Sequence, residues 1–319
     1  MKSKHISDSD QDKAEKPVKL VHYTTAEAAY KILETGTLWM RQTALMNDKE
    51  EIRLACVVKG YDENIIPPMR RNTYITSFSQ QAVDETEERD YRGRLSMWHV
   101  YSTSGGVALV FNENFTNDLH EMNAHHKDCA YPLRILFDKV DYIDIKSPKE
   151  LESQKEPEFI KDIGFEYENE WRVSLSLTPR FCQDLEGDPR YECTCYPPDS
   201  KDPTFLFEAK TESIRIIPQK IYTMNFNIKE YLDCIIIGPT PFDDEVDAIK
   251  NSFHRLLIQK GIISGHQQLA DKQMELAANA ENEHDLIMAL SPERTRDQWY
   301  QEAYNRYIKC SPIPYRPTR

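Results

Sequence analysis

Residues 168–177 alternate between polar and apolar side chains, and this alternation constrains the fold more than any other feature of the chain. The apolar positions are Trp171, Val173, Leu175 and Leu177, and the polar positions are Glu168, Glu170, Arg172, Ser174 and Ser176. Because successive side chains of a strand point to opposite faces, the pattern predicts a strand with one face in a core. The other face is predicted to carry two carboxylates and a guanidinium.

Further short strands and helices are predicted on either side of this segment. Strands are predicted at 18–23, 37–41, 72–78, 107–112, 133–137, 140–145, 205–207, 214–217 and 234–238, and helices at 25–35, 47–55, 94–101 and 243–260. The first helix has a capping-box pattern from Thr24 to Glu27 and ends at Gly36. Strands and helices do not alternate regularly, which favours an α+β fold with a mixed or mostly antiparallel sheet and flanking helices.

The 319 residues are sufficient for one large domain or two small ones. Residues 1–17 are polar and charged and are predicted as a disordered tail. An ordered domain is expected over 18–264, followed by a helical C-terminal extension over 265–319. We also expect the acidic loop from Gln80 to Arg92 to be mobile and to lie over the mouth of a pocket. It would act either as a lid or as a selectivity filter for a basic protein acceptor, and the alternative is a solvated connector.

Composition and charge disfavour several functional classes. The formal net charge is −13, so binding of nucleic acid by bulk electrostatics is disfavoured. Binding of nucleic acid in a local basic cleft is not excluded by this charge. No apolar run is long enough for a membrane span, and the N-terminus lacks the apolar core of a secretory signal. A cytoplasmic protein with no membrane association is therefore expected. The seven irregularly spaced cysteines are expected to be free thiols.

Common cofactor and metal motifs are absent from the sequence. It contains no GxGxxG, GxxxxGK[ST], GxSxG or HExxH. Two groups of possible metal ligands, His120, His125, His126 and Cys129 in one and Cys182, Cys193 and Cys195 in the other, do not have the spacing of a zinc site. We therefore expect no bound metal.

Three residues remain as candidates for chemistry. Glu168 and Glu170 are predicted to share a strand face roughly 7 Å apart, where two carboxylates can divide catalytic roles. The alternative is a solvated face in which Arg172 forms a salt bridge. His22 shares a predicted strand face with Leu20, and it is either a core histidine or a ligand-binding one.

The order of these segments resembles the ADP-ribosyltransferase fold of the His-Tyr-Glu type, which includes diphtheria toxin and the poly(ADP-ribose) polymerases. The segments are LVHYTT, KILETG, YITSFS, SMWHVY, GVALVFN and ENEWRVSL, in that order. They also resemble a bacterial family of unknown function that shares HYT, Trp-x-x-Tyr, GVxLxF and E-x-E-W-R motifs. The first resemblance implies a split mixed or antiparallel sheet and NAD as the substrate, without a metal.

The resemblance also implies roles for particular residues. His22 would bind the adenosine-side ribose of NAD, the backbone of Tyr23 would hold the nicotinamide amide, and Glu170 would be catalytic. Glu168 matches a second acidic residue of arginine-modifying members. The family's central Tyr has no clean match, so the stacking aromatic is Phe78, Trp98 or Tyr101. Tyr23 also stands where the family has Gly.

Two functional classes follow from the resemblance. The first is an enzyme that transfers ADP-ribose from NAD to an unknown acceptor, either protein or nucleic acid, and acts as a toxin or phage-defence effector. The second is a catalytically degenerate member of the same fold that binds a nucleotide or a protein partner, in the latter case through the C-terminal helices. Turnover of NAD discriminates between them.

Overall fold

The computed structural model describes most of the predicted domain. The described residues are 18–46, 52–81, 94–101, 106–126, 133–144, 155–177, 193–195, 205–214, 217–240, 242–263, 279, 282 and 305–311. The predicted tail at 1–17, nearly all of the acidic loop and most of the predicted C-terminal extension lie outside these residues.

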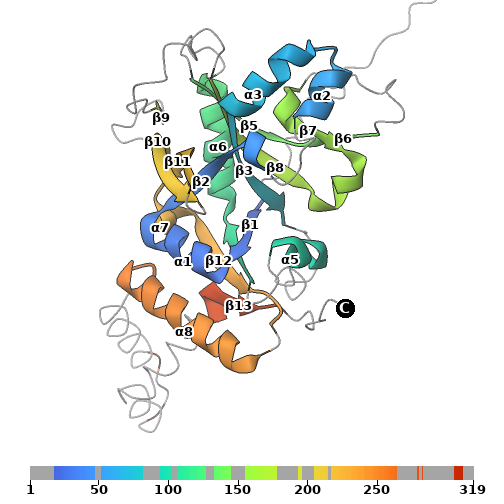
Figure 1. Ribbon diagram of the computed structural model, residues 1–319. Coiled ribbons are helices and arrows are strands. Elements are labelled where there is room, and N and C mark those ends of the chain that lie inside the picture. The colour runs from blue at the N-terminus through green and yellow to red at the C-terminus, as the bar shows by residue number, and fades with distance from the viewer. Residues whose placement is uncertain are drawn as a thin grey trace, which may run out of the picture.

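The chain has a mixed α and β structure, as the sequence predicted (Figure 1). In chain order the first elements are β1 (Leu20–Thr25), α1 (Ala26–Thr35), β2 (Thr37–Gln42), η1 (Thr43–Leu45), α2 (Arg53–Val58), η2 (Glu63–Ile65), α3 (Ile66–Asn72), β3 (Thr73–Gln80), α5 (Leu95–Tyr101), β4 (Gly106–Phe111), α6 (Glu113–His126), β5 (Leu133–Lys139) and β6 (Asp141–Ile143). The remaining elements are η4 (Pro157–Phe159), β7 (Ile160–Asp162), η5 (Ile163–Glu168), β8 (Glu170–Leu177), β9 (Cys193–Cys195), β10 (Phe205–Ile214), β11 (Ile217–Asn225), α7 (Ile228–Tyr231), β12 (Leu232–Ile237), α8 (Asp243–Gln259) and β13 (Ile308–Cys310).

An 11-stranded sheet organises these elements. Its order is β13-β12-β4-β1-β3-β2-β11-β10-β9, with β8 beside β3 and β5 beside β8. Among the described strands, β12 pairs with β13 in parallel and β6 pairs with β7 in parallel. The other described pairs are antiparallel. The predicted mixed, mostly antiparallel sheet is therefore confirmed.

The sheet divides at β3, which pairs with β8 along one edge and with two different strands along the other. β1 pairs with β3 only at Leu20 and Val21, although it pairs with β4 along its whole length. β2 pairs with an earlier part of β3, at Tyr74 and Ile75. In the described registers, the middle of β3 therefore has no ladder partner on the side where β1 and β2 diverge. His22 is the first residue of β1 beyond the paired section.

One face of the sheet carries the main hydrophobic core. Trp171, Val173 and Leu175 of β8 face this core, as the alternation predicted, and α1, α6 and α8 cover it. The main contributions of the three helices are Ala29, Ile32 and Leu33 from α1, Phe115, Leu119 and Met122 from α6, and Phe253, Leu256 and Leu257 from α8. Each helix supplies these residues at the three- and four-residue spacing of one helical face.

Two smaller layers cover the opposite face. Helix α5 packs Met97 and Trp98 onto β1, β4 and β12. The other layer, made of η4, β7 and η5, covers the polar side of β8, with α2 packed against Ile143 and Ile160 beyond it. The polar face of β8 is thus covered by the strand β7 and by the short helical segments η4 and η5.

The ends of α1 show how far the local sequence determines a helix. Gly36 ends the helix in the left-handed region at φ 66°, as predicted, and an added Cβ would lie 2.6 Å from the carbonyl oxygen of Phe226. At the other end the cap is Thr25, whose hydroxyl accepts from the N–H of Ala28 at 3.2 Å, so the predicted cap at Thr24 is wrong by one residue. Glu27 pairs instead with a lysine one turn further on.

Several elements differ from the sequence-based expectation. The strand predicted at 214–217 includes the last residue of β10 and the first residue of β11, two long paired strands of which the sequence otherwise predicted only 205–207. Helix α6 was not predicted. Ile308–Cys310 form β13, a strand on the sheet edge, within the segment expected to be helical. Among the described helices, none is long and apolar enough to cross a membrane.

Candidate functional site

His22 occupies the point where β1 separates from β3. Its Nδ1 lies 3.0 Å from the carbonyl oxygen of Ser77, and because a carbonyl only accepts, Nδ1 must carry the proton. In the register of β1 and β3, Ser77 would face Tyr23 if pairing continued. The imidazole therefore contacts a carbonyl that lies just beyond the paired part of the ladder.

The environment of His22 favours its neutral form. Burial lowers its pKa, the hydrogen bond to Ser77 opposes this effect, and the positive charge of Arg41 adds to the lowering. With Nδ1 protonated and the ring neutral, Nε2 is a hydrogen-bond acceptor. The side chain is half-buried. It can therefore offer an uncharged acceptor to a hydroxyl group.

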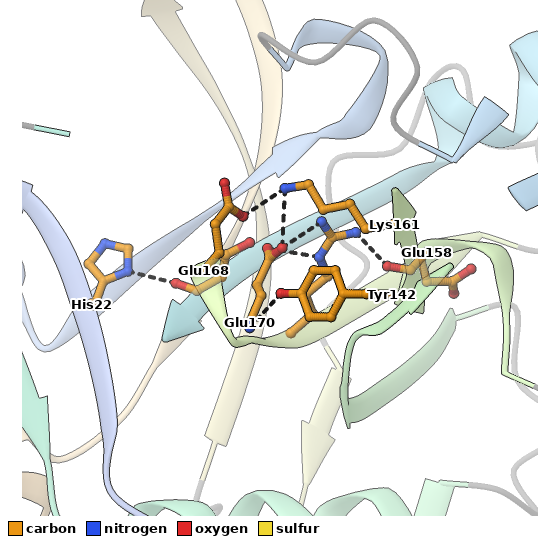
Figure 2. Close-up of polar contacts among 8 residues, drawn as sticks. His22, Tyr142, Glu158, Lys161, Glu168 and Glu170 are labelled. Atoms are coloured by element: carbon orange, nitrogen blue, oxygen red, sulfur yellow. Dashed lines mark hydrogen bonds and ion pairs between the residues drawn. The ribbon is translucent and has the colours of Figure 1, made fainter. Parts of the chain in front are cut away.

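Glu170 is at the centre of a buried network of charges on the polar face of β8 (Figure 2). Arg172, which is completely buried, grips both of its oxygens, with Nε to Oε1 at 2.8 Å and Nη2 to Oε2 at 2.9 Å. Lys161 from β7 lies between the two glutamates, 3.3 Å from Glu170 and 2.8 Å from Glu168. The backbone N–H of Glu170 donates to the hydroxyl of Tyr142 at 2.8 Å. The network thus combines two carboxylates with two cations.

A third carboxylate extends this network. Arg172 Nη1 donates to the backbone oxygen of Glu158 at 2.6 Å, and the hydroxyl of Ser174 donates to the Glu158 carboxylate at 3.2 Å. Arg172 therefore links β8 to η4, and it also neutralises the carboxylate of Glu170. Burial raises the pKa of Glu158, with the charge of Glu156 adding to the effect.

The structure corrects the predicted position of Glu168. The predicted strand began at Glu168, but β8 begins at Glu170, and Glu168 ends η5. The reason is Asn169, which adopts a left-handed conformation at φ 44° and breaks the extended backbone. The two carboxylates are therefore not i and i+2 neighbours on one strand. Lys161 brings them together instead.

The two glutamates have pKa values shifted in opposite directions. Burial alone would raise the pKa of Glu170, but the charges of Arg172 and Lys161 outweigh it and lower that pKa to about 2. For Glu168, burial dominates and raises the pKa, with partial compensation by Lys161 and a further rise from the charge of Glu170. Burial also raises the pKa of Tyr142, to about 12. Glu170 is consequently ionised at neutral pH.

Ser77 joins the two halves of this site. Its carbonyl oxygen contacts His22, and its side chain is close enough to Glu170 to help lower the pKa of that carboxyl. Ser77 lies opposite Arg172 in the register of β3 and β8, so its side chain faces the same network. The predicted histidine and the predicted catalytic glutamate thus approach Ser77 from two different strands.

Two of the three aromatic candidates, Phe78 and Trp98, are buried in the core. Phe78 is 2% exposed and lies on the core face of β3, with its ring centroid 5.8 Å from that of His22. Trp98 is 3% exposed and packs edge-on to Tyr23 at 4.9 Å. It also lies so close to Gly238 that an added Cβ there would be 2.7 Å from the indole. Tyr101 ends α5, and its side chain is outside the described part of the structure.

The side chain of Tyr23 has a structural role. Its side chain faces α5, and its hydroxyl accepts from the backbone N–H of Arg94 at 2.9 Å. Burial raises the pKa of this hydroxyl. Its backbone, for which nicotinamide binding was predicted, follows directly after the separation of β1 from β3.

The sequence analysis missed Lys161, Tyr142, Glu158 and Ser77. One signal could have indicated a cation such as Lys161. If Glu168 and Glu170 are buried with Arg172, one of the two negative charges still needs a positively charged partner. The other three lacked such a signal because their roles depend on which segments the fold stacks over β8.

The sequence analysis considered two groups of His and Cys residues as metal ligands, and the structure describes only some of them. His120 lies on α6 and packs against the rings of Phe137 at 4.9 Å and Trp171 at 5.6 Å. The side chains of the other candidates are outside the described residues. Within the described residues, no three His, Cys, Asp or Glu residues are grouped as metal ligands.

Comparison with known proteins gave one match. A family model described as a protein of unknown function (DUF2971) matches residues 97–173, which run from α5 to the middle of β8. The matched segment includes Lys161 and both glutamates of the network. Neither the search of curated proteins nor the search of solved structures found a match.

Proposed function

We propose that this protein is an ADP-ribosyltransferase-like enzyme that consumes NAD and transfers ADP-ribose to a macromolecular acceptor. The observation that carries the proposal is the double contact of Ser77 with His22 and Glu170 where β1 and β3 separate. These are the two residues that the order of motifs marks for ribose binding and catalysis. The acceptor, and any role in toxicity or phage defence, is open to experiment.

The charge state of the site suits the chemistry of this reaction. When the bond between nicotinamide N1 and ribose C1′ breaks, its electron pair leaves with nicotinamide and positive charge develops on the ribose. Glu170 is ionised at neutral pH and would stabilise that charge. The acceptor nucleophile then bonds to C1′ and loses its proton.

The other residues of the site would position these groups. Neutral His22 offers Nε2 to a ribose hydroxyl, while its Nδ1 remains bonded to Ser77. Lys161 and Arg172 hold the carboxylate of Glu170 in one orientation, so little reorganisation is needed during the reaction.

A second function, nucleotide or partner binding without turnover, has its own supporting observation. Both oxygens of Glu170 are engaged by Arg172 and Lys161, and Glu170 is only 4% exposed. Phe78 and Trp98 are also packed in the core and would have to move to stack on nicotinamide. Substrate would therefore need to rearrange this network before catalysis.

Release of nicotinamide from NAD separates the two functions. We expect the wild-type protein to release nicotinamide and Glu170→Gln to be slower by on the order of 10²–10³, because it loses the charge that stabilises the transition state. His22→Ala is expected to weaken NAD binding. His254→Ala, which changes another half-buried histidine on α8, is the matched control and should leave turnover unchanged.

The outcomes of this experiment are distinct. Because Glu170→Gln also alters a buried ion pair, its melting temperature is measured beside its activity, and His22→Ala provides a second variant outside that network. Calorimetric binding of NAD without nicotinamide release would favour the second function. Unchanged release in both variants, or neither binding nor release in the wild type, would overturn the proposed enzyme.

A further inference from the structure

A cavity of about 350 Å³ lies between η1, α2, η2 and α3, remote from α8 in Figure 1. The charged residues that line it in the described part of the chain are Arg53, Arg70, Arg71 and Glu63. Ile66 contributes an apolar wall. The lining includes none of the residues of the network around Glu170, so the cavity is a separate feature of the molecule.

The charge of this lining is opposite to that of the protein. Among the described residues, three guanidinium groups and one carboxylate line it, in a chain whose formal net charge is −13. Arg71 and Glu63 are exposed, and the side chain of neither forms a hydrogen bond or ion pair with any residue in the described part of the chain. Like charges gathered in one cavity repel one another, and a bound anion would relieve that repulsion.

Capping of α3 does not account for its two arginines. Basic residues often stabilise the C-terminus of a helix through its terminal carbonyl groups. Here, however, Gln42 Nε2 donates to the carbonyl oxygen of Arg71 at 2.6 Å, and the hydroxyl of Thr43 donates to that of Arg70 at 2.9 Å. These carbonyls are thus satisfied by η1 and the residue before it.

Arg70 adds a donor without a partner. Its Nη2 makes one long contact, 3.4 Å from the carbonyl oxygen of Thr43, and its buried Nε has no partner in the described structure. A buried N–H without an acceptor is unfavourable, and a ligand oxygen in the cavity would provide one. Arg70 and Arg71 therefore offer several donors next to one another.

We propose that this cavity binds the phosphate group of a small phosphate-bearing ligand. The planar guanidinium fork matches the oxygens of a phosphate, and a phosphate monoester carries about −1.5 to −2 charge at pH 7, opposite in sign to Arg70 and Arg71. The volume lies at the lower end of the roughly 300–1,000 Å³ typical of small-molecule sites. The negative net charge of the chain disfavours a nucleic-acid backbone as the ligand.

Titration calorimetry with inorganic phosphate and with AMP, at ionic strength matched by chloride, tests this site independently of NAD turnover. We expect saturable binding of at least one probe, weakened on the order of tenfold by Arg71→Gln. Arg71 suits the test because it is exposed and its side chain has no partner among the described residues. Arg255→Gln, on the exposed side of α8, is the matched control and should bind like the wild type.

The comparison of probes identifies the source of the phosphate. Tighter binding of AMP than of phosphate supports a nucleotide-like ligand, and equal binding supports recognition of the phosphate group alone. No saturable binding, or equal weakening by Arg71→Gln and Arg255→Gln, overturns the proposal. Binding of a short single-stranded oligonucleotide without binding of phosphate or AMP also overturns it, in favour of a nucleic-acid backbone.

Discussion

Arg172 is the residue whose removal should affect this molecule most. Its guanidinium is completely buried, makes two bonds to Glu170 at 2.8 and 2.9 Å and donates to the backbone oxygen of Glu158 at 2.6 Å. Arg172→Met keeps much of the side-chain volume but removes all of these donors. Lys161 would remain as the only cation of the network beside two carboxylates.

The expected loss of stability is large because a charge would be left buried without its main partner. Removing one member of a buried ion pair typically costs about 3–5 kcal/mol in the free energy of unfolding. The matched control is Arg134→Met, because Arg134 pairs with Glu156 at 2.7 Å but is 45% exposed. Such an exposed pair contributes about 0–1 kcal/mol. Urea denaturation followed by circular dichroism at pH 7 measures both variants.

The loss of stability in Arg172→Met should depend on pH, and the direction of this dependence follows from the pKa of Glu170. In the wild type the pKa of Glu170 is about 2, below its ordinary value of 4.5, so its ionised form contributes stability above pH 4.5 that is lost as the pH falls towards 2. Without Arg172, the effect of burial would raise this pKa. The stability difference between Arg172→Met and the wild type should therefore shrink as the pH falls from 7 to 5.

A double variant tests the same reasoning. Glu170→Gln combined with Arg172→Met removes both charges, and it should recover part of the stability lost in Arg172→Met alone. A loss below about 1 kcal/mol for Arg172→Met, or one that is the same at pH 5 and pH 7, would refute the argument.

Two glycine substitutions test the packing around the sheet. Gly36→Ala should destabilise by about 1–3 kcal/mol more than Gly60→Ala, because both residues have positive φ but only Gly36 would place a Cβ 2.6 Å from the oxygen of Phe226; equal losses in urea denaturation would contradict this. Gly238→Ala should cost about 1–3 kcal/mol and shift the fluorescence of Trp98, because the added Cβ would lie 2.7 Å from the indole ring. An unchanged spectrum and midpoint would show that the indole is not packed against Gly238.

The local sequence pattern predicted the elements in which apolar residues recur at the regular spacing of a strand or a helix. The alternation after Asn169 correctly assigned the core and polar faces of β8. It did not predict that Asn169 adopts a left-handed conformation, because asparagine tolerates both conformations and the choice depends on the contacts of η5. The position of Glu168 was wrong for that reason.

Other elements depend on tertiary contacts that a local pattern does not contain. Helix α6 has only Phe115, Leu119 and Met122 as large buried apolar residues in its 14 positions, and its stability comes from packing them against the sheet. The charge network likewise needs η4 and β7 to be stacked over β8. The sequences of η4, β7 and β8 show which residues are charged, but they do not show that these residues are buried.

The parallel pairing of β12 with β13 has a practical consequence for anyone who shortens this chain. β12 is an apolar strand, and Ile308 of β13 is 3% exposed beside it, with the N–H of Ser311 donating to Ile237 at 2.8 Å. Ending a recombinant fragment at residue 264, the domain boundary that the sequence suggests, would strip β13 away and leave the hydrogen-bonding edge of β12 uncovered. Open apolar edges recruit strands from other molecules. A fragment meant to stay monodisperse should therefore retain the chain through Ser311.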